Sequence, residues 1–113
     1  MHEFAVTEGL VQIVHEEARK AGAARVKEVH VTIGELSTFV DRSIEFYFTE
    51  LSRGTAAEGA SLFFSTVEAR ARCDLCDLEF RPESAFFVCP ECKGPVFELA
   101  QGQELYVDSI EID

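Results

Sequence analysis

Basic residues and long hydrophobic runs are scarce in this sequence of 113 residues. Lys and Arg number 10 against 21 Asp and Glu, so the formal net charge at pH 7 is -11. Because nucleic-acid binding needs cationic side chains that neutralise phosphates, this balance predicts no nucleic-acid partner. No apolar run approaches the roughly 20 residues that cross a bilayer, so we also expect no membrane partner.

Motifs for export and for catalysis are absent as well. The first residues read MHEFAVTEGL and place acidic side chains where a secretory signal peptide carries basic ones. We therefore expect a cytoplasmic protein. The sequence contains no nucleophile–base pair and no glycine-rich phosphate loop, so we expect that it is not an enzyme.

The sequence does contain enough apolar material for one domain, since 47% of its residues are hydrophobic. Apolar residues at helical spacing predict one helix at 4–21, which ends before Gly22. A second apolar stripe predicts a helix at about 41–52, with Asp41 as its N-cap. Each helix therefore has one apolar face to bury.

Three further segments alternate between apolar and polar residues, the pattern typical of strands. They are 26–33, 61–72 and 104–112. The last segment changes phase at Ser109, which fits a β-bulge.

The order of these elements predicts an α+β fold, a three-stranded sheet with two helices, into which a zinc-ribbon-like module is inserted. We expect residues 1–70 and 98–113 to form the α+β domain. Residues 71–97 would form the inserted module.

The inserted segment carries all four cysteines as two C-x-x-C pairs, formed by Cys73 and Cys76 and by Cys89 and Cys92. In a reducing compartment such thiols indicate metal ligation rather than two disulfides. Two pairs close a tetrahedron of thiolates with no open position, the arrangement of a structural Zn(2+) site. An iron centre of the rubredoxin type uses the same four thiolates and is the main alternative.

The chain begins with Met1, His2 and Glu3, a short segment rich in nitrogen ligands. The α-amine, the His2 imidazole and the deprotonated amides of His2 and Glu3 can form a four-nitrogen square plane, which suits Ni(II) or Cu(II). The Glu3 carboxylate would then be an axial ligand or a neighbour of the bound ion. A frayed and solvated terminus is the alternative interpretation.

The other two histidines do not lie near the cysteines in the sequence. His15 falls on the first predicted helix, where we expect it to be solvated. His30 alternates with Val29 and Val31, so we expect it on the polar face of its strand. Neither is predicted to bind a metal.

Together these features resemble the HypA/HybF family of nickel metallochaperones over essentially the whole chain. Five features carry the resemblance: the MHE start, VTIGELS at 31–37, GTAAEGA at 54–60, the two C-x-x-C pairs, and GQEL at 102–105. The sequence departs from the family pattern after the last cysteine, where Lys93, Gly94 and Pro95 replace the usual Gly-Ser.

The resemblance implies a protein that carries Ni(2+) to nickel-iron hydrogenase and, in some organisms, to urease. It assigns His2 as the essential nickel ligand, Glu3 as a contributor, and the four cysteines as zinc ligands. The implied partners are a nickel-loading GTPase of the hydrogenase maturation system and the hydrogenase large-subunit precursor, with the chaperone a monomer or a homodimer. The alternatives are a zinc-ribbon interaction module without a nickel role and an iron electron carrier.

Overall fold

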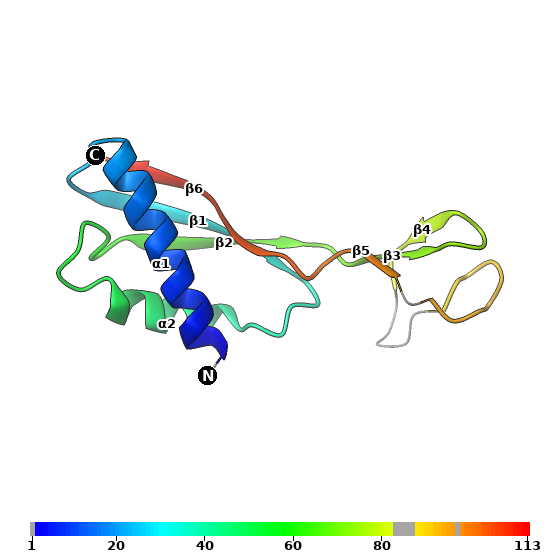
Figure 1. Cartoon of the computed structure of the whole chain (residues 1–113). Helices are drawn as coiled ribbons and strands as arrows, with labels where there is room; N and C mark the ends of the chain where they lie inside the picture. Colours follow the sequence, from blue (N-terminus) through cyan, green and yellow to red (C-terminus); the bar gives the residue numbers. More distant parts are fainter. Residues whose placement is uncertain (1, 83–87, 97) are drawn as a thin grey trace.

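Two three-stranded sheets lie at opposite ends of a molecule that measures 55 × 27 × 17 Å (Figure 1). The computed structural model describes residues 2–82, 88–96 and 98–113, with the backbone alone of His2. In chain order the elements are α1 (His2–Lys20), β1 (Val26–Gly34), α2 (Asp41–Leu51), β2 (Ser61–Val67), β3 (Arg70–Cys73), β4 (Leu78–Phe80), β5 (Glu98–Gln101) and β6 (Leu105–Ile112). The first sheet has the strand order β2-β1-β6 and the second has the order β4-β3-β5. The α+β prediction is confirmed.

Both predicted helices are present, and a glycine ends the first one. Gly22 follows α1 with a φ of 66°, a left-handed conformation that glycine adopts without steric cost. The N–H of Ala23 donates to the carbonyl of Ala18 over 2.9 Å, which closes the helix end in the Schellman manner. In the part of the chain that the structure describes, no helix is long and apolar enough to cross a membrane.

The start of α2 differs from the prediction, because Asp41 is not the N-cap. Val40 holds that position with φ -101° and ψ 126°, and no side chain caps the helix. Asp41 is already helical, and its Oδ1 accepts the N–H of Arg42 over 2.8 Å. A carboxylate in the first turn still interacts favourably with the helix dipole, so Asp41 stabilises α2 from the position after the N-cap.

β1 is the central strand of the first sheet. It pairs in parallel with β2 and antiparallel with β6. Parallel neighbours need a crossover, which the chain makes through α2. Opposite β6 the register shifts between His30 and Val31, which pair with Ser109 and Val107, so Asp108 has no partner on β1. The bulge predicted at Ser109 is therefore confirmed.

The two helices bury one face of this sheet. Val29 and Val31 of β1 belong to one apolar cluster with residues of both helices. Val14 of α1 and Phe48 of α2 are the most buried of these helical residues, and both of them and both valines of β1 are at most 1% exposed. His30, which lies between the two valines, is on the opposite face and is only half-buried. The polar-face prediction for His30 is therefore correct.

The segment predicted as one strand at 61–72 is in fact two strands that belong to different sheets. β2 ends at Val67 and β3 begins at Arg70. Between them the N–H of Ala69 donates to the carboxylate of Glu35 over 2.8 Å instead of joining a β-ladder. The apolar alternation continues through the break, which is why the sequence pattern does not reveal it.

The second sheet has a small core of its own. Its buried members are Ala71, Cys73, Cys89 and Val96, with Leu78 and Phe80 packed against them. The strands β3, β4 and β5 contain only four, three and four residues, too few for a periodic pattern to predict them. Half of the buried side chains in this core are cysteines, so apolar burial alone holds it weakly.

Candidate metal sites

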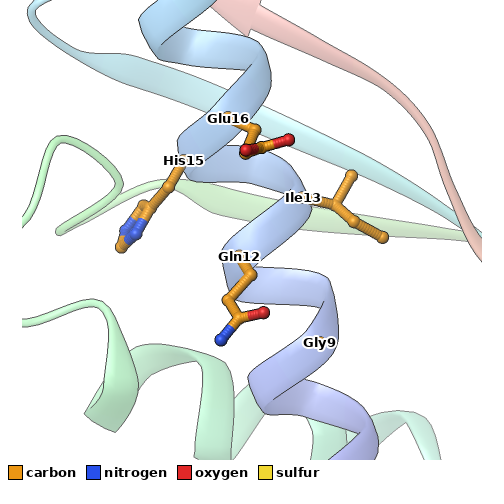
Figure 2. Close-up of a pocket in the computed structure, with 5 residues that line it drawn as sticks. All are labelled: Gly9, Gln12, Ile13, His15 and Glu16. Carbon is orange, nitrogen blue, oxygen red and sulfur yellow. The ribbon is translucent and has the colours of Figure 1, made fainter.

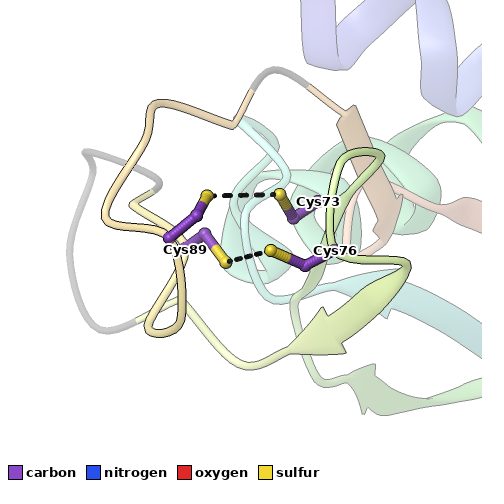
Figure 3. A group of neighbouring side chains, drawn as sticks. Cys73, Cys76 and Cys89 are labelled. Atoms are coloured by element: carbon purple, nitrogen blue, oxygen red, sulfur yellow. Dashed lines mark hydrogen bonds between the residues drawn. The ribbon is translucent and has the colours of Figure 1, made fainter.

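The four cysteine side chains converge beside the second sheet (Figure 3). All four sulfur atoms lie within 4.8 Å of one another, and none is in a disulfide. Sγ of Cys73 is 3.8 Å from Sγ of Cys92, and Sγ of Cys89 is 3.9 Å from Sγ of Cys76. Sulfurs that bind one tetrahedral zinc ion at about 2.3 Å lie about 3.8 Å apart, so the donor set fits such an ion.

The two C-x-x-C turns share one backbone feature. The residue after the second cysteine is left-handed in each, with φ 51° at Asp77 and φ 61° at Lys93. In the second turn the N–H of Lys93 donates to the carbonyl of Cys89 over 2.9 Å, and the N–H of Cys89 donates to Gly94 over 3.0 Å. The two turns bring their thiols toward one point, as a four-sulfur metal site requires.

The thiols also perturb one another's ionisation. Hydrogen bonding with Cys92 and then burial raise the pKa of Cys76 to about 12. The backbone N–H of Cys92 lowers the pKa of Cys89 to about 7, against the opposing effect of burial. Four sulfurs this close repel one another as thiolates, so full ionisation depends on a bound cation. Soft thiolate ligands select zinc or iron among the common metals.

Acidic side chains lie around the cysteine cluster. A hydrogen bond with Asp74 is the main cause that raises the pKa of Glu98, and the charge of Asp74 adds to it. Arg72 counters part of this charge, with its Nε 3.8 Å from Asp74 and a further contact to Asp77. Asp74, Glu98 and Arg72 line a shallow hollow beside Cys73. A face of this charge does not suit phosphate.

The predicted nickel ligands are only partly visible. Met1 and the side chain of His2 lie outside the described residues, whereas Glu3 is in the first turn of α1. The Oε2 of Glu3 accepts the N–H of Val40 over 3.4 Å, just before α2. The carbonyl of Glu3 accepts the hydroxyl of Thr7, a fully buried side chain.

An aromatic contact continues this packing beside the first turn. Phe4 packs edge-on against Tyr47 of α2, with the ring centroids 5.4 Å apart. Glu3 and Phe4, in the first turn of α1, therefore contact α2 and the residue that precedes it.

A hollow along α1 is lined by Gly9, Gln12, Ile13, His15 and Glu16 (Figure 2). Gln12 and His15 extend to one side of the helix and Ile13 to the other. His15 is half-buried, and its Nε2 is buried and makes no hydrogen bond to the described residues, so the expectation of a solvated side chain holds only in part. These side chains offer no convergent donor set, and we assign no binding role to the hollow.

Comparison with known proteins gives one consistent family. The profile described as "Hydrogenase/urease nickel incorporation, metallochaperone, hypA" matches residues 1–112. The hydrogenase maturation factor HypA of Caldanaerobacter subterraneus is 42% identical over 114 residues and covers 100% of both chains. That of Pyrococcus furiosus is 36% identical and covers 100% of this chain and 96% of its own.

Solved structures agree with this result. A solution structure of a HypA protein matches with a TM-score of 0.77 and 27% identity, covering 100% of this chain and 97% of its own. The solution structure of the Ni metallochaperone HypA from Helicobacter pylori has a TM-score of 0.70 and 25% identity, covering 97% and 96%. In each case the alignment extends over nearly all of this chain, including the segments that form both sheets.

Proposed function

Since this chain belongs to the HypA family of nickel-incorporation metallochaperones, we propose that it binds Ni(II) at its N-terminus and delivers the ion to a nickel-iron hydrogenase precursor. The whole-length match to that family is the observation that carries this proposal. Delivery requires a site that holds nickel and then releases it. A chelate of a few groups at one helix end meets that requirement better than a closed cage of side chains.

In this proposal the nickel ligands are the Met1 amine, the His2 imidazole and Glu3. The first N–H groups of an α-helix have no acceptor within the helix, so the amides at this end are available. The positive end of the helix dipole disfavours a bare cation. Anionic ligands offset this effect, and the Glu3 carboxylate, held beside Val40, supplies one of them.

We propose that Cys73, Cys76, Cys89 and Cys92 hold a structural zinc ion. Sulfur separations of 3.8 and 3.9 Å and a closed four-thiolate set support zinc, which needs no open ligand position for such a role. Residues 71–97 would fold around this ion as the inserted module. Residues 1–70 and 98–113 would form the nickel-binding domain, except that Arg70 and Glu98–Gln101 pair within the second sheet and so belong with the module.

The partners we propose are a nickel-loading GTPase and the hydrogenase large-subunit precursor, all in the cytoplasm. The protein itself would catalyse no reaction, because its role is to hold and transfer an ion. Binding to a purified nickel-loading GTPase from the same organism tests the partner, with bovine serum albumin as a control for non-specific association. If no binding is detected with either nickel-loaded or nickel-free protein, the proposed partner is wrong.

Nickel titration calorimetry on four zinc-loaded proteins tests the proposed site. They are the chain with its free amine, the His2→Ala variant, the chain extended at its N-terminus, and the chain extended at its C-terminus. We expect the N-terminal nickel-binding event only in the first and the last, because the other two lose the imidazole or the amine. Affinity should also fall as the pH drops from about 7.5 to about 6, since nickel must displace protons.

Two controls keep the result interpretable. Zinc content and far-UV circular dichroism should be the same in all four proteins, which shows that only the nickel ligands changed. Equal nickel affinity in the N-terminally extended protein would exclude the amine as a ligand. If His2→Ala also binds nickel normally, the nickel site does not lie at the N-terminus. Such a result would contradict the proposed ligands, and it would equally contradict the alternative of a zinc-ribbon module without a nickel role.

A further inference from the structure

Away from both sites, one imidazole and two carboxylates meet on the face of the first sheet that the helices do not cover. Glu28 and His30 lie on this face of β1, two residues apart. The antiparallel register places Glu111 of β6 directly opposite Glu28. One ligand atom from each of the three side chains lies within 4.8 Å of the other two. We call these three residues the sheet triad.

The two carboxylates of the sheet triad have no cationic partner from Lys or Arg among the described residues. Among the described residues, the one basic group that Glu28 contacts is the imidazole of His30. The nearest basic residues in sequence are engaged elsewhere, since Lys27 and Arg25 both approach Asp113 at 3.9 Å. Like charges directly opposite each other on a sheet are destabilising. A bound cation would remove that repulsion.

His30 is already oriented toward the carboxylates. Its Nε2 is 3.0 Å from Oε1 of Glu28. Its ring stacks on Phe63 of the neighbouring strand, with centroids 5.2 Å apart and planes inclined by 17°. Stacking restricts the ring to one plane, so little order is lost when its nitrogen binds a ligand. His30 and Glu28 are about two-thirds covered, with exposed side-chain fractions of 35% and 33%.

From this arrangement we infer that Glu28, His30 and Glu111 form a second metal site, specific for a divalent transition metal. One imidazole nitrogen and two carboxylate oxygens suit ions such as Co(II), Ni(II) and Zn(II) rather than ions that prefer thiolates. Three protein ligands leave positions for water, so bound metal would exchange, unlike metal in a closed four-thiolate site. Glu111 is exposed, so its carboxylate has room to adjust toward a bound ion. The inference does not depend on the proposed nickel function.

Cobalt titration of the full-length, zinc-loaded His2→Ala protein tests the second site, because this background lacks the proposed N-terminal site. We expect one saturable event by calorimetry, with paramagnetic broadening of NMR signals centred on Glu28, His30 and Glu111. Zinc retention, measured by elemental analysis, shows that cobalt has not entered the cysteine site. His30→Gln and Glu111→Gln should each weaken binding about tenfold or more, or about 1.4 kcal/mol.

Asp108→Asn is the matched control, since it removes one negative charge from β6 without removing a ligand. It should keep the affinity within a few-fold of the parent protein. Glu28→Gln distinguishes loss of binding from loss of folding. It relieves the repulsion between the two carboxylates, so the protein should be at least as stable while it binds cobalt more weakly. Absence of saturable binding, broadening centred elsewhere, or equal losses in Asp108→Asn and Glu111→Gln would each overturn the inference.

Discussion

The backbone carbonyl of Gly102 occupies the space where any other residue at Gly34 would carry its Cβ. The same carbonyl accepts the N–H of Leu36 over 2.8 Å, and the N–H of Gly34 donates to the carbonyl of Glu104 over 2.7 Å. Gly34 ends β1, and Gly102 lies between β5 and β6. This contact therefore joins the two sheets at the point where the chain passes from one to the other.

Gly34→Ala should disrupt this junction. The added methyl group meets backbone rather than a mobile side chain, so one strand end must move, at a cost of about 3 kcal/mol or more in the free energy of unfolding. Urea denaturation followed by circular dichroism measures the loss. Gly9→Ala is the matched control, because nothing lies within 4 Å of an added Cβ there. That change should stabilise α1 by about 0.5–1 kcal/mol.

Metal removal should unfold one sheet and leave the other. The second sheet's core includes Cys73 and Cys89, whereas the clusters between the helices and the first sheet contain no cysteine among their described members. We expect Cys73→Ser, or exhaustive chelation, to abolish NMR signals typical of β3 to β5 while those of α1 and β1 persist.

A substitution within the same loop serves as the control for this experiment. Leu75 lies between Cys73 and Cys76 and is 90% exposed, so Leu75→Ser should retain the metal. Loss of the helical circular dichroism signal in Cys73→Ser would show that the two sheets do not fold independently. If the purified protein shows iron–thiolate absorption, the metal at the four cysteines is iron and the zinc proposal is wrong.

The left-handed backbone at Lys93 makes a separate prediction about metal retention. A β-branched residue is strained at φ 61°, so Lys93→Val should lower the free energy of metal retention by about 1 kcal/mol. Lys93→Gly has no such strain and should retain metal at least as well as the parent chain. The rate of zinc transfer to a chromogenic chelator ranks the three proteins. Faster release from the glycine variant than from the valine variant would contradict this account of the turn.

The carboxyl pair Asp74 and Glu98 predicts how stability changes with pH. The folded-state pKa of Glu98 is raised, so the folded state binds more protons than the unfolded one and stability falls as pH rises through that pKa. Glu98→Gln removes the repulsion and should stabilise the second sheet near pH 7, with the advantage shrinking in acid. Thermal unfolding of the zinc-loaded proteins between about pH 5 and 8 measures this trend.

Glu91→Gln is the control for that series, because it removes an equivalent charge from an exposed position of the same module. Glu91→Gln should change the stability only slightly, and by the same amount at every pH in this range. A Glu98→Gln advantage that grows as the pH falls would reverse the sign of the prediction.

Sequence alone was sufficient for features that depend on local spacing. The helix over His2–Lys20 follows from apolar periodicity and the glycine after it, and the bulge near Ser109 follows from a change of phase within one strand. The two C-x-x-C pairs predicted a four-sulfur site because tight turns place each pair of thiols together. The order of these motifs was also enough to indicate the family.

Tertiary contacts decided the features that join distant segments. The break between Val67 and Arg70 depends on hydrogen bonding from Ala69 to Glu35, which lies 34 residues away and leaves no trace in the alternation of residues 61–72. The cap of α2 was set by Val40 and its contact with α1, so a good capping residue one position later was not used.

The sheet triad depends both on local spacing and on tertiary contacts. Glu28 and His30 are near each other in any extended strand, because alternate side chains share a face. Glu111 joins them only through the antiparallel register of β1 and β6, which a bulge shifts by one residue. Local periodicity specifies which face a side chain takes, whereas the pairing of strands far apart in the chain specifies its neighbours on that face.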